Sequence, residues 1–114
     1  MYQNKSQGAL LTILQLINEI ISEPDIQESL CLLGGVPLVM HYTTSEYNHS
    51  IRTEVARFVG IMCSATTHVA QMFVSCRTFP LIVNLLEPNY EEGKEMIHFT
   101  LDAIIKIFKI HVNK

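Results

Sequence analysis

The stretch Cys31-Leu32-Leu33-Gly34-Gly35-Val36-Pro37 is matched further along the chain by Cys76-Arg77-Thr78-Phe79-Pro80, and the two prolines are 43 residues apart. A short apolar segment precedes each junction and another follows each proline. Proline fits the first turn of a helix, because its missing N–H would have no helical partner there. Gly34-Gly35 lets the first junction turn sharply, since glycine adopts positive φ without steric cost. The second junction has no glycine, so its turn must be built with Arg77-Thr78.

Three longer blocks of apolar residues at helical spacing surround these junctions. The blocks are Leu10, Leu11, Leu14, Ile17 and Ile21; Val55, Phe58, Val59 and Met62; and Met96, Ile97, Leu101, Ile104, Ile105 and Phe108. Strand-like alternation is nowhere sustained, so the chain is predicted to be all-α. Shorter helices are expected over 26–33 (opened by Asp25 as N-cap), 36–42, 69–76 and 79–86, with loops over 43–50 and 87–93.

The helical pattern repeats along the chain. A shift of 43 residues places Phe58 on Leu101 and Met62 on Ile105, and a shift of 44 places Leu14 on Phe58. A period near 43, with two short helices and one long helix per unit, is typical of armadillo or HEAT repeats, and the Gly-Gly junction favours armadillo. We therefore predict one domain over 1–114, a right-handed helical solenoid. It would hold the last helix of a partial repeat at 8–23 and full repeats at 25–66 and 68–111.

The composition narrows the class of protein. The 114 residues are 48% hydrophobic and 17% charged, which indicates a folded domain and excludes a disordered segment. A net charge of -3 lacks the basic footprint of a nucleic-acid binder. The apolar stretch 9–21 is too short and too polar for membrane insertion. Three cysteines without CxxC spacing favour a reducing compartment, which predicts a cytoplasmic protein.

The residues that carry chemistry form no recognisable catalytic or metal-binding pattern. The five histidines show neither HxxxH nor HExxH spacing, and no Gly-rich phosphate loop is present. His98 and Asp102 can pair on a helix surface, but a nucleophile and an oxyanion site are not recognisable beside them. The sequence therefore predicts no metal, no cofactor and no enzymatic activity of this chain.

Two features suggest binding to another protein. Arg52 and Arg57, near the start of the second long helix, are expected to face an inner groove and meet acidic groups of an extended or helical peptide. Ordinary exposed charges are the alternative. The last helix is apolar over more than half of its circumference, through Ile104, Ile107 and Ile110. Such a surface is expected to be covered by further repeats of a longer array, by a homodimer partner or by a partner helix.

Several strings are more particular than a repeat consensus. They are Leu14-Gln15-Leu16-Ile17-Asn18-Glu19-Ile20-Ile21, the 31–37 junction, Arg52-Thr53-Glu54-Val55-Ala56, Gln71-Met72-Phe73-Val74-Ser75-Cys76-Arg77, Leu86-Glu87-Pro88-Asn89-Tyr90-Glu91 and Glu95-Met96-Ile97-His98. Together they resemble the non-catalytic armadillo region of the septation-initiation and mitotic-exit network protein kinases and of the plant epsilon-type MAP kinase kinase kinases. The sequence departs from that pattern at Arg77-Thr78, where the family has a glycine, and at Ala103-Ile104-Ile105.

The resemblance implies a function outside catalysis. In that family the kinase domain is N-terminal, and the region after it targets the enzyme to spindle poles and engages a Ras-like GTPase. This chain has no Gly-rich loop, no His-Arg-Asp and no Asp-Phe-Gly. It would then be a docking segment of a serine/threonine kinase that binds a Ras-like small GTPase or a spindle-pole scaffold, in the cytoplasm, at the spindle pole body or the cytoskeleton. The alternative is a stand-alone armadillo-like adaptor, or a homodimeric structural protein, with no kinase attached.

Overall fold

The computed structural model describes residues 2–86 and 90–112, with side chains over 7–86 and 91–110, and all regular elements in this part of the chain are helices. In chain order they are α1 (Tyr2–Ile20), α2 (Pro24–Leu32), α3 (Gly35–Met40), the 3-10 helix η1 (His41–Thr43), α4 (His49–Ser64), α5 (Thr67–Ser75), α6 (Phe79–Val83) and α7 (Tyr90–Val112). The all-α prediction is confirmed.

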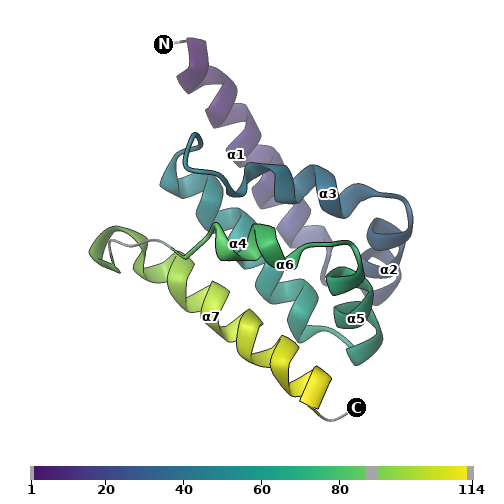
Figure 1. Ribbon diagram of the computed structural model, residues 1–114. Helices are drawn as coiled ribbons and strands as arrows, with labels where there is room; N and C mark the ends of the chain where they lie inside the picture. Colours follow the sequence, from purple (N-terminus) through teal and green to yellow (C-terminus); the bar gives the residue numbers. More distant parts are fainter. Residues whose placement is uncertain (1, 87–89, 113–114) are drawn as a thin grey trace.

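The three long helices lie side by side, with α4 between α1 and α7, and they run in the same general direction (Figure 1). The short helices pack along one flank of this row. There α2 contacts α5, and η1 contacts both α4 and α6. Two short α-helices therefore precede α4, with the 3-10 helix η1 after them, and two short α-helices precede α7, in the predicted order. The assignment of this arrangement to an armadillo solenoid stays a prediction.

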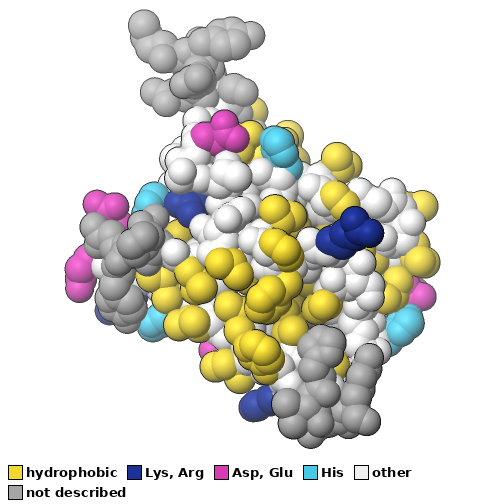
Figure 2. Space-filling view, viewed as in Figure 1, with side chains coloured by type: hydrophobic (Ala, Val, Ile, Leu, Met, Phe, Trp, Pro, Cys, Tyr) yellow, Lys and Arg dark blue, Asp and Glu magenta, His cyan; other side chains and the backbone are white. Residues whose placement is uncertain are grey.

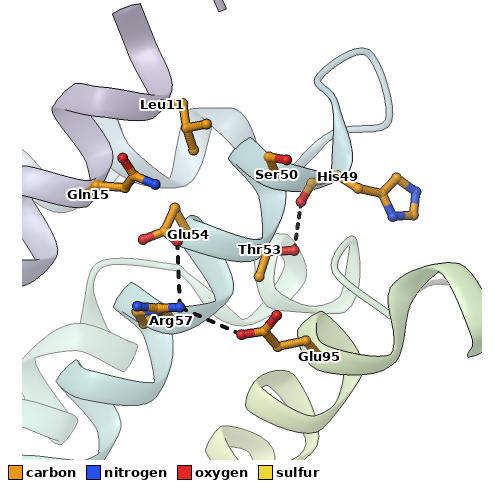
Figure 3. A pocket seen from close by; sticks show the side chains of 8 residues that line it. All are labelled: Leu11, Gln15, His49, Ser50, Thr53, Glu54, Arg57 and Glu95. Atoms are coloured by element: carbon orange, nitrogen blue, oxygen red, sulfur yellow. Dashed lines mark hydrogen bonds and ion pairs between the residues drawn. The ribbon is translucent and has the colours of Figure 1, made fainter. Parts of the chain in front are cut away.

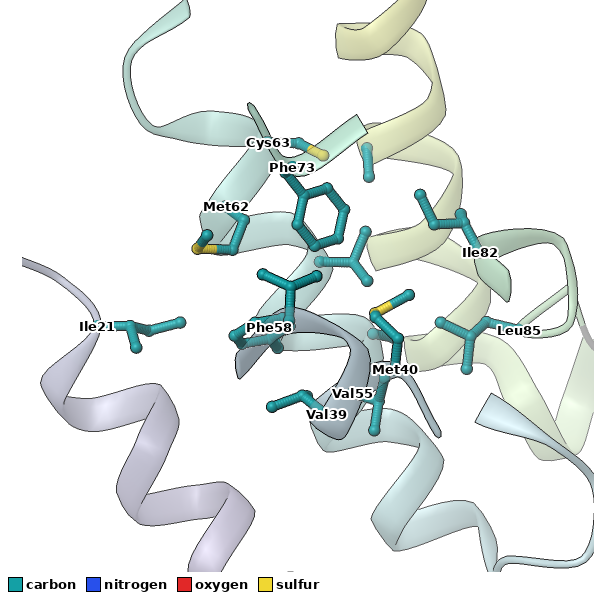
Figure 4. Close-up of a cluster of buried hydrophobic side chains, with 14 of the residues drawn as sticks. Ile21, Val39, Met40, Val55, Phe58, Met62, Cys63, Phe73, Ile82 and Leu85 are labelled. Atoms are coloured by element: carbon teal, nitrogen blue, oxygen red, sulfur yellow. The ribbon is translucent and has the colours of Figure 1, made fainter. Parts of the chain in front are cut away.

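The core is centred on α4. Its predicted apolar stripe, Val55, Phe58, Val59 and Met62, is fully buried. The ring of Phe58 meets that of Phe73 on α5 edge to face, with ring centroids 6.0 Å apart (Figure 4). Burying one such side chain contributes about 1.5–3 kcal/mol to the free energy of folding, relative to leaving it in water. Helix α4 therefore holds the short helices and α7 in one core.

Side-chain caps set the start of two helices. The Asn48 side chain accepts a hydrogen bond of 2.9 Å from the Ile51 N–H, and the Thr66 hydroxyl accepts one of 3.1 Å from the Val69 N–H. Each satisfies an N–H that the first helical turn leaves without a partner. The prediction of Asp25 as N-cap is wrong, because Glu23 holds that position and Pro24 begins the helix.

Helix ends differ from the predicted ones by a few residues. Helix α1 extends from Tyr2 to Ile20 rather than over 8–23, and α6 ends at Val83. Of the loop predicted over 87–93, residues 87–89 lie outside the described residues, and α7 has begun by Tyr90. Gly93 interrupts the regular helix with φ -108 and ψ 19. The loop therefore ends before residue 93, where the prediction placed its end, because α7 already includes Tyr90.

Candidate protein-binding groove

A polar groove crosses α1, α4 and α7 (Figure 3). It consists of two adjoining hollows of about 280 and 300 Å³ that share Gln15, Glu54 and Arg57. Side chains from all three long helices line it: Leu11, Gln15, Asn18, Glu19, His49, Ser50, Thr53, Glu54, Arg57 and Glu95. On α4 the lining residues lie three and four apart, which places them on one helix face.

Arg57 lies at the centre of the groove. Its guanidinium is 3.7 Å from Glu54 Oε2 and 3.6 Å from Glu95 Oε1, so it links α4 to α7. The same group lies over the Phe99 ring, 5.7 Å from the ring centroid. Both ion-pair distances exceed those of direct hydrogen bonds, and the side chain is 44% exposed. Arg57 is therefore placed to donate hydrogen bonds to a ligand.

Asn18 links α1 to α4 at the floor of the groove. Its Nδ2 donates to the main-chain carbonyl of Glu54 at 2.9 Å and to Glu54 Oε1 at 3.0 Å. Asn18 Oδ1 is buried and has no hydrogen-bond partner within the described part of the chain. The carboxylate of Glu54 is thus held between an amide and a guanidinium, which accounts for a buried acidic residue at this position.

The groove carries more negative than positive charge. Three carboxylates, those of Glu19, Glu54 and Glu95, line it together with the single guanidinium of Arg57. Arg57 was expected to meet acidic groups of a partner, but Glu54 and Glu95 already flank it. An acidic ligand would have to compete with both. The charge of the lining instead favours a neutral or basic ligand.

The structure places Arg52 outside the groove lining, where its side chain donates hydrogen bonds to two neighbouring elements. Arg52 is buried, and its Nε donates to the Thr43 carbonyl at 3.1 Å, while Nη2 donates to the Asn84 carbonyl at 2.7 Å. The Asn84 side-chain amide in turn donates to the Thr43 hydroxyl at 3.3 Å. Arg52 therefore joins η1, α4 and the end of α6, and we do not carry it into the candidate binding surface.

The exposed apolar face of α7 is not the face that was predicted for partner binding. Ile107 is buried, at 2% exposure, and Ile104 and Ile110 are half-buried. Among residues 91–110, the exposed large apolar side chains are instead Leu101, Ile105 and Phe108. Hydrophobic side chains gather over α6 and α7 on the face seen in Figure 2. That face of α7, rather than the one around Ile107, is available to a partner.

The Cys31 thiol lies close enough to that of Cys76 for a side-chain hydrogen bond. Burial raises the pKa of Cys31 to about 11 and that of Cys63 to about 12, and all three cysteines are free thiols. Within the described ranges, no three His, Cys, Asp or Glu side chains are grouped as a metal ion would require. Over the same residues, none of the helices combines the length and apolar character needed to cross a lipid bilayer.

Of the residues that line the groove, only Arg57 was predicted from the sequence as a binding residue, and the residues that hold it and the groove together, Asn18, Glu54 and Glu95, were not. Two of them carry a local signal. Asn18 is one of three polar residues, with Gln15 and Glu19, in the mainly apolar segment 14–21, and Glu54 lies three residues before Arg57 on a predicted helix. Glu95 carries no such signal, because its meeting with Arg57 depends on how α7 packs against α4.

The described part of the chain is thus an all-helical domain with a polar groove across its long helices. Over 104 residues it is 39% identical to MAP3K epsilon protein kinase 1 of Arabidopsis thaliana, a match that covers 89% of this chain and 8% of that protein. It is 34% identical over 101 residues to cytokinesis protein sepH of Emericella nidulans, covering 88% of this chain and 8% of the relative.

A more distant relative is cell division control protein 7 of Schizosaccharomyces pombe, 23% identical over 106 residues, which are 92% of this chain and 10% of that protein. No protein-family model matches the chain, and no solved structure matches it significantly. The chain spans less than a tenth of the length of the first two of these relatives. It is homologous to a short, non-catalytic region of related kinases.

Proposed function

We propose that this chain is a protein-interaction module that acts as a docking or targeting segment of a septation or mitotic-exit serine/threonine kinase. The observation that carries the proposal is its alignment, over most of its length, with a small part of proteins named as kinases and as a cytokinesis protein. The chain itself has no kinase motif. A segment without catalytic residues contributes to such a protein by binding.

An armadillo-type array is the arrangement we propose for this segment. The order of two short helices and one long helix occurs twice, and the prolines of α3 and α6 are 43 residues apart. Stacked helices of this kind present a continuous surface of successive long helices. A Ras-like small GTPase or a spindle-pole scaffold is the proposed partner, with the module located in the cytoplasm or at the spindle pole body.

The groove across α1, α4 and α7 is the proposed docking surface. The Arg57 guanidinium is placed to donate to main-chain carbonyls of a bound segment, while the exposed carboxylates of Glu19 and Glu95 attract lysine or arginine side chains. We therefore propose that the partner contributes a neutral or basic segment. Its attraction to the groove would weaken with rising salt, because these carboxylates are exposed.

The test uses the relative sepH, whose matching segment can be removed from the full protein. Deleting that segment in Emericella nidulans should abolish septation while kinase activity of the purified protein persists. Replacing the segment by this chain should restore septation at least in part. Normal septation after the deletion, with the shortened protein present at its usual level, would contradict the proposal.

Charge variants within the replaced segment test the groove itself. Glu95→Lys should reduce rescue and weaken recovery of bound proteins from extracts, because it reverses a charge at the groove rim. Lys109→Glu is the matched control, since it reverses an exposed charge on the same helix outside the groove lining. If both variants restored septation equally well, the binding surface would have to lie elsewhere on the chain.

A further inference from the structure

Two of the three cysteines meet where α2 packs against α5 (Figure 1). Cys31 lies in the last turn of α2, and Cys76 is the residue at which α5 ends. Their thiols are close enough for a side-chain hydrogen bond, although the two residues are 45 positions apart in the chain. Both residues are half-buried at the edge of the hydrophobic core. A small oxidant can therefore reach this pair from solvent.

Cys63, on α4, is in a different environment and provides an internal comparison. It is 4% exposed, and the influences on its pKa are burial, which raises it, and Lys106, which lowers it, with no second thiol among them. The chain thus has one pair of neighbouring thiols near its surface and one thiol enclosed in the core. Only the pair can undergo a two-electron oxidation within the chain.

We propose that Cys31 and Cys76 form a reversible oxidation site, which hydrogen peroxide converts into an intramolecular disulfide that links α2 to α5. The two sulfur atoms of a disulfide lie about 2.05 Å apart, and thiols already in contact need only a small movement to reach that separation. Disulfides are usually transient in the reducing compartment that the cysteine spacing predicts. The pair therefore fits a redox switch. The proposal does not involve Arg57, so it holds or fails independently of the docking function.

The surroundings assign different roles to the two cysteines. Burial, the adjacent Cys76 thiol and the Glu28 carboxylate together raise the pKa of Cys31 to about 11, so this thiol stays protonated near neutral pH. The thiolate is the form that attacks an oxidant. Cys76 therefore reacts first. Its thiolate sulfur takes one oxygen atom of hydrogen peroxide to give the sulfenic acid, the O–O bond breaks, and the hydroxide that leaves takes up the proton released by Cys76.

Cys31 completes the reaction as the second thiol. Its sulfur attacks the sulfur of the Cys76 sulfenic acid, so the S–S bond forms, the S–O bond breaks, and water leaves with the Cys31 proton. In total, two thiols are oxidised to one disulfide while one hydrogen peroxide is reduced to two water molecules. The protonated Cys31 thiol is a weak nucleophile, but its contact with Cys76 makes the second step intramolecular, which compensates for that weakness.

The disulfide would hold α2 against α5. It would close a loop over residues 31–76 that contains α3, η1 and α4. A cross-link of this kind stabilises the folded protein because it restricts the unfolded chain, so the Tm of the oxidised chain should exceed that of the reduced chain by at least about 5 °C. Since the pair is half-exposed, dithiothreitol should reduce the bond without denaturant.

The test oxidises the purified chain with a small molar excess of hydrogen peroxide. The remaining thiols are then alkylated in urea, and the whole and the digested chain are weighed by mass spectrometry. We expect a monomer with a single alkylated thiol, at Cys63, and a cross-linked pair of peptides that contains Cys31 and Cys76. Treatment with dithiothreitol before alkylation should restore three alkylated thiols.

Three variants separate the roles of the cysteines. In Cys31→Ser the sulfenic acid at Cys76 should persist and be captured by dimedone. In Cys76→Ser the dimedone adduct at Cys31 should be at least about tenfold smaller, because burial, the largest cause of its raised pKa, persists. Cys63→Ala is the matched control, and it should form the cross-link between Cys31 and Cys76 as readily as the unaltered chain.

Four results would overturn the proposal. Oxidation could cross-link separate chains or involve Cys63, or it could give sulfinic and sulfonic acids at Cys31 or Cys76 without a disulfide. The oxidised chain could have a lower Tm than the reduced one, which would show that the bond distorts the contact between α2 and α5. An equal dimedone adduct in Cys31→Ser and Cys76→Ser would refute the assigned order of the two steps.

Discussion

Arg77 adopts the left-handed main-chain conformation of Gly34, the residue 43 positions before it, with φ 61 against φ 81. Gly34 lies between α2 and α3, and Arg77 lies between α5 and α6. Both residues therefore turn the chain at the same point of two successive pairs of short helices. A side chain in this conformation costs about 1–2 kcal/mol, because Cβ crowds the following carbonyl oxygen, whereas glycine avoids that cost.

Replacing Arg77 by glycine should therefore raise the free energy of unfolding by about 0.5–1 kcal/mol. The gain is smaller than the steric cost, since glycine also loses more main-chain freedom on folding. The reverse change, Gly34→Ala, should lower the free energy of unfolding by about 1 kcal/mol. A Cβ at Gly34 would meet nothing within 4 Å, so this loss would come from the main chain alone. Urea denaturation of both variants measures the two effects, and a destabilised Arg77→Gly would contradict this account.

Gly35, next to Gly34, is required for a different reason. A Cβ at Gly35 would collide with Leu30 Cδ1 and lie 3.0 Å from Leu30 Cγ. Gly35→Ala should therefore lower the free energy of unfolding by about 1–3 kcal/mol through overpacking. Leu30→Ala removes the colliding atoms, so the double variant should be less destabilised than the sum of the two single changes. Strict additivity in urea denaturation would show that the collision is not the cause.

The sequence predicts the helices and the centre of the core well, because both follow from local patterns. The period-3.6 stripe through Val55, Phe58 and Met62 assigns the buried face of α4, and all three are fully buried. Pro37 and Pro80 predict the starts of α3 and α6 within two residues. A single stripe of apolar residues has only one way to face the core, so no knowledge of the packing partner is needed.

The candidate site is predicted less well, because it depends on packing between distant helices. A buried Arg52 requires main-chain carbonyls from η1 and from the end of α6, and no local pattern shows that these come together. On α7 the apolar residues surround more than half of the helix, so their spacing alone does not distinguish Ile107, which is buried, from Ile105, which is exposed. Contact with α4 decides between them.

Arg52 should prove essential for stability rather than for binding. Arg52→Met leaves the buried carbonyl of Thr43 and the part-buried carbonyl of Asn84 without this donor, and losing a buried partner costs about 1–3 kcal/mol. We expect the free energy of unfolding to fall by about 2–4 kcal/mol in urea denaturation. Arg57→Met is the control and should cost less, about 1 kcal/mol, since its pair with Glu95 is exposed and Asn18 still donates to the buried Glu54 carboxylate. Similar losses for both variants would refute the different roles assigned here.

Two lysine substitutions on α7 distinguish its buried face from its exposed face. Ile107→Lys forces an ammonium group into the core and should unfold much of the protein at 25 °C, because an unpaired buried charge is costly. Ile105→Lys should leave the circular dichroism spectrum and the thermal midpoint nearly unchanged. If the chain self-associates through α7, light scattering behind size exclusion should show that Ile105→Lys shifts it towards the monomer. Equal thermal stability of the two variants would contradict the burial of Ile107 and the exposure of Ile105.

Cys63 should make the protein less stable in alkali. Burial raises the pKa of its thiol from 9.0 to about 12 in the folded chain, so between these values the folded state keeps a proton that the unfolded state has released. The unfolded state then binds fewer protons, and the free energy of unfolding falls as pH rises, by up to about 1.4 kcal/mol per pH unit. The stabilisation is complete below pH 9 and is lost as the pH approaches 12.

Removing the thiol should therefore remove part of this pH dependence. Between pH 8 and pH 10, Cys63→Ala should lose roughly 1 kcal/mol less stability than the unaltered chain, measured by urea denaturation at each pH. Below pH 8 the two proteins should differ by a constant amount, because the thiol is protonated in both the folded and the unfolded chain. Other groups titrate equally in the two proteins and cancel in the difference. Parallel losses of stability up to pH 10 would show that the Cys63 thiol ionises in the folded chain as readily as in the unfolded one.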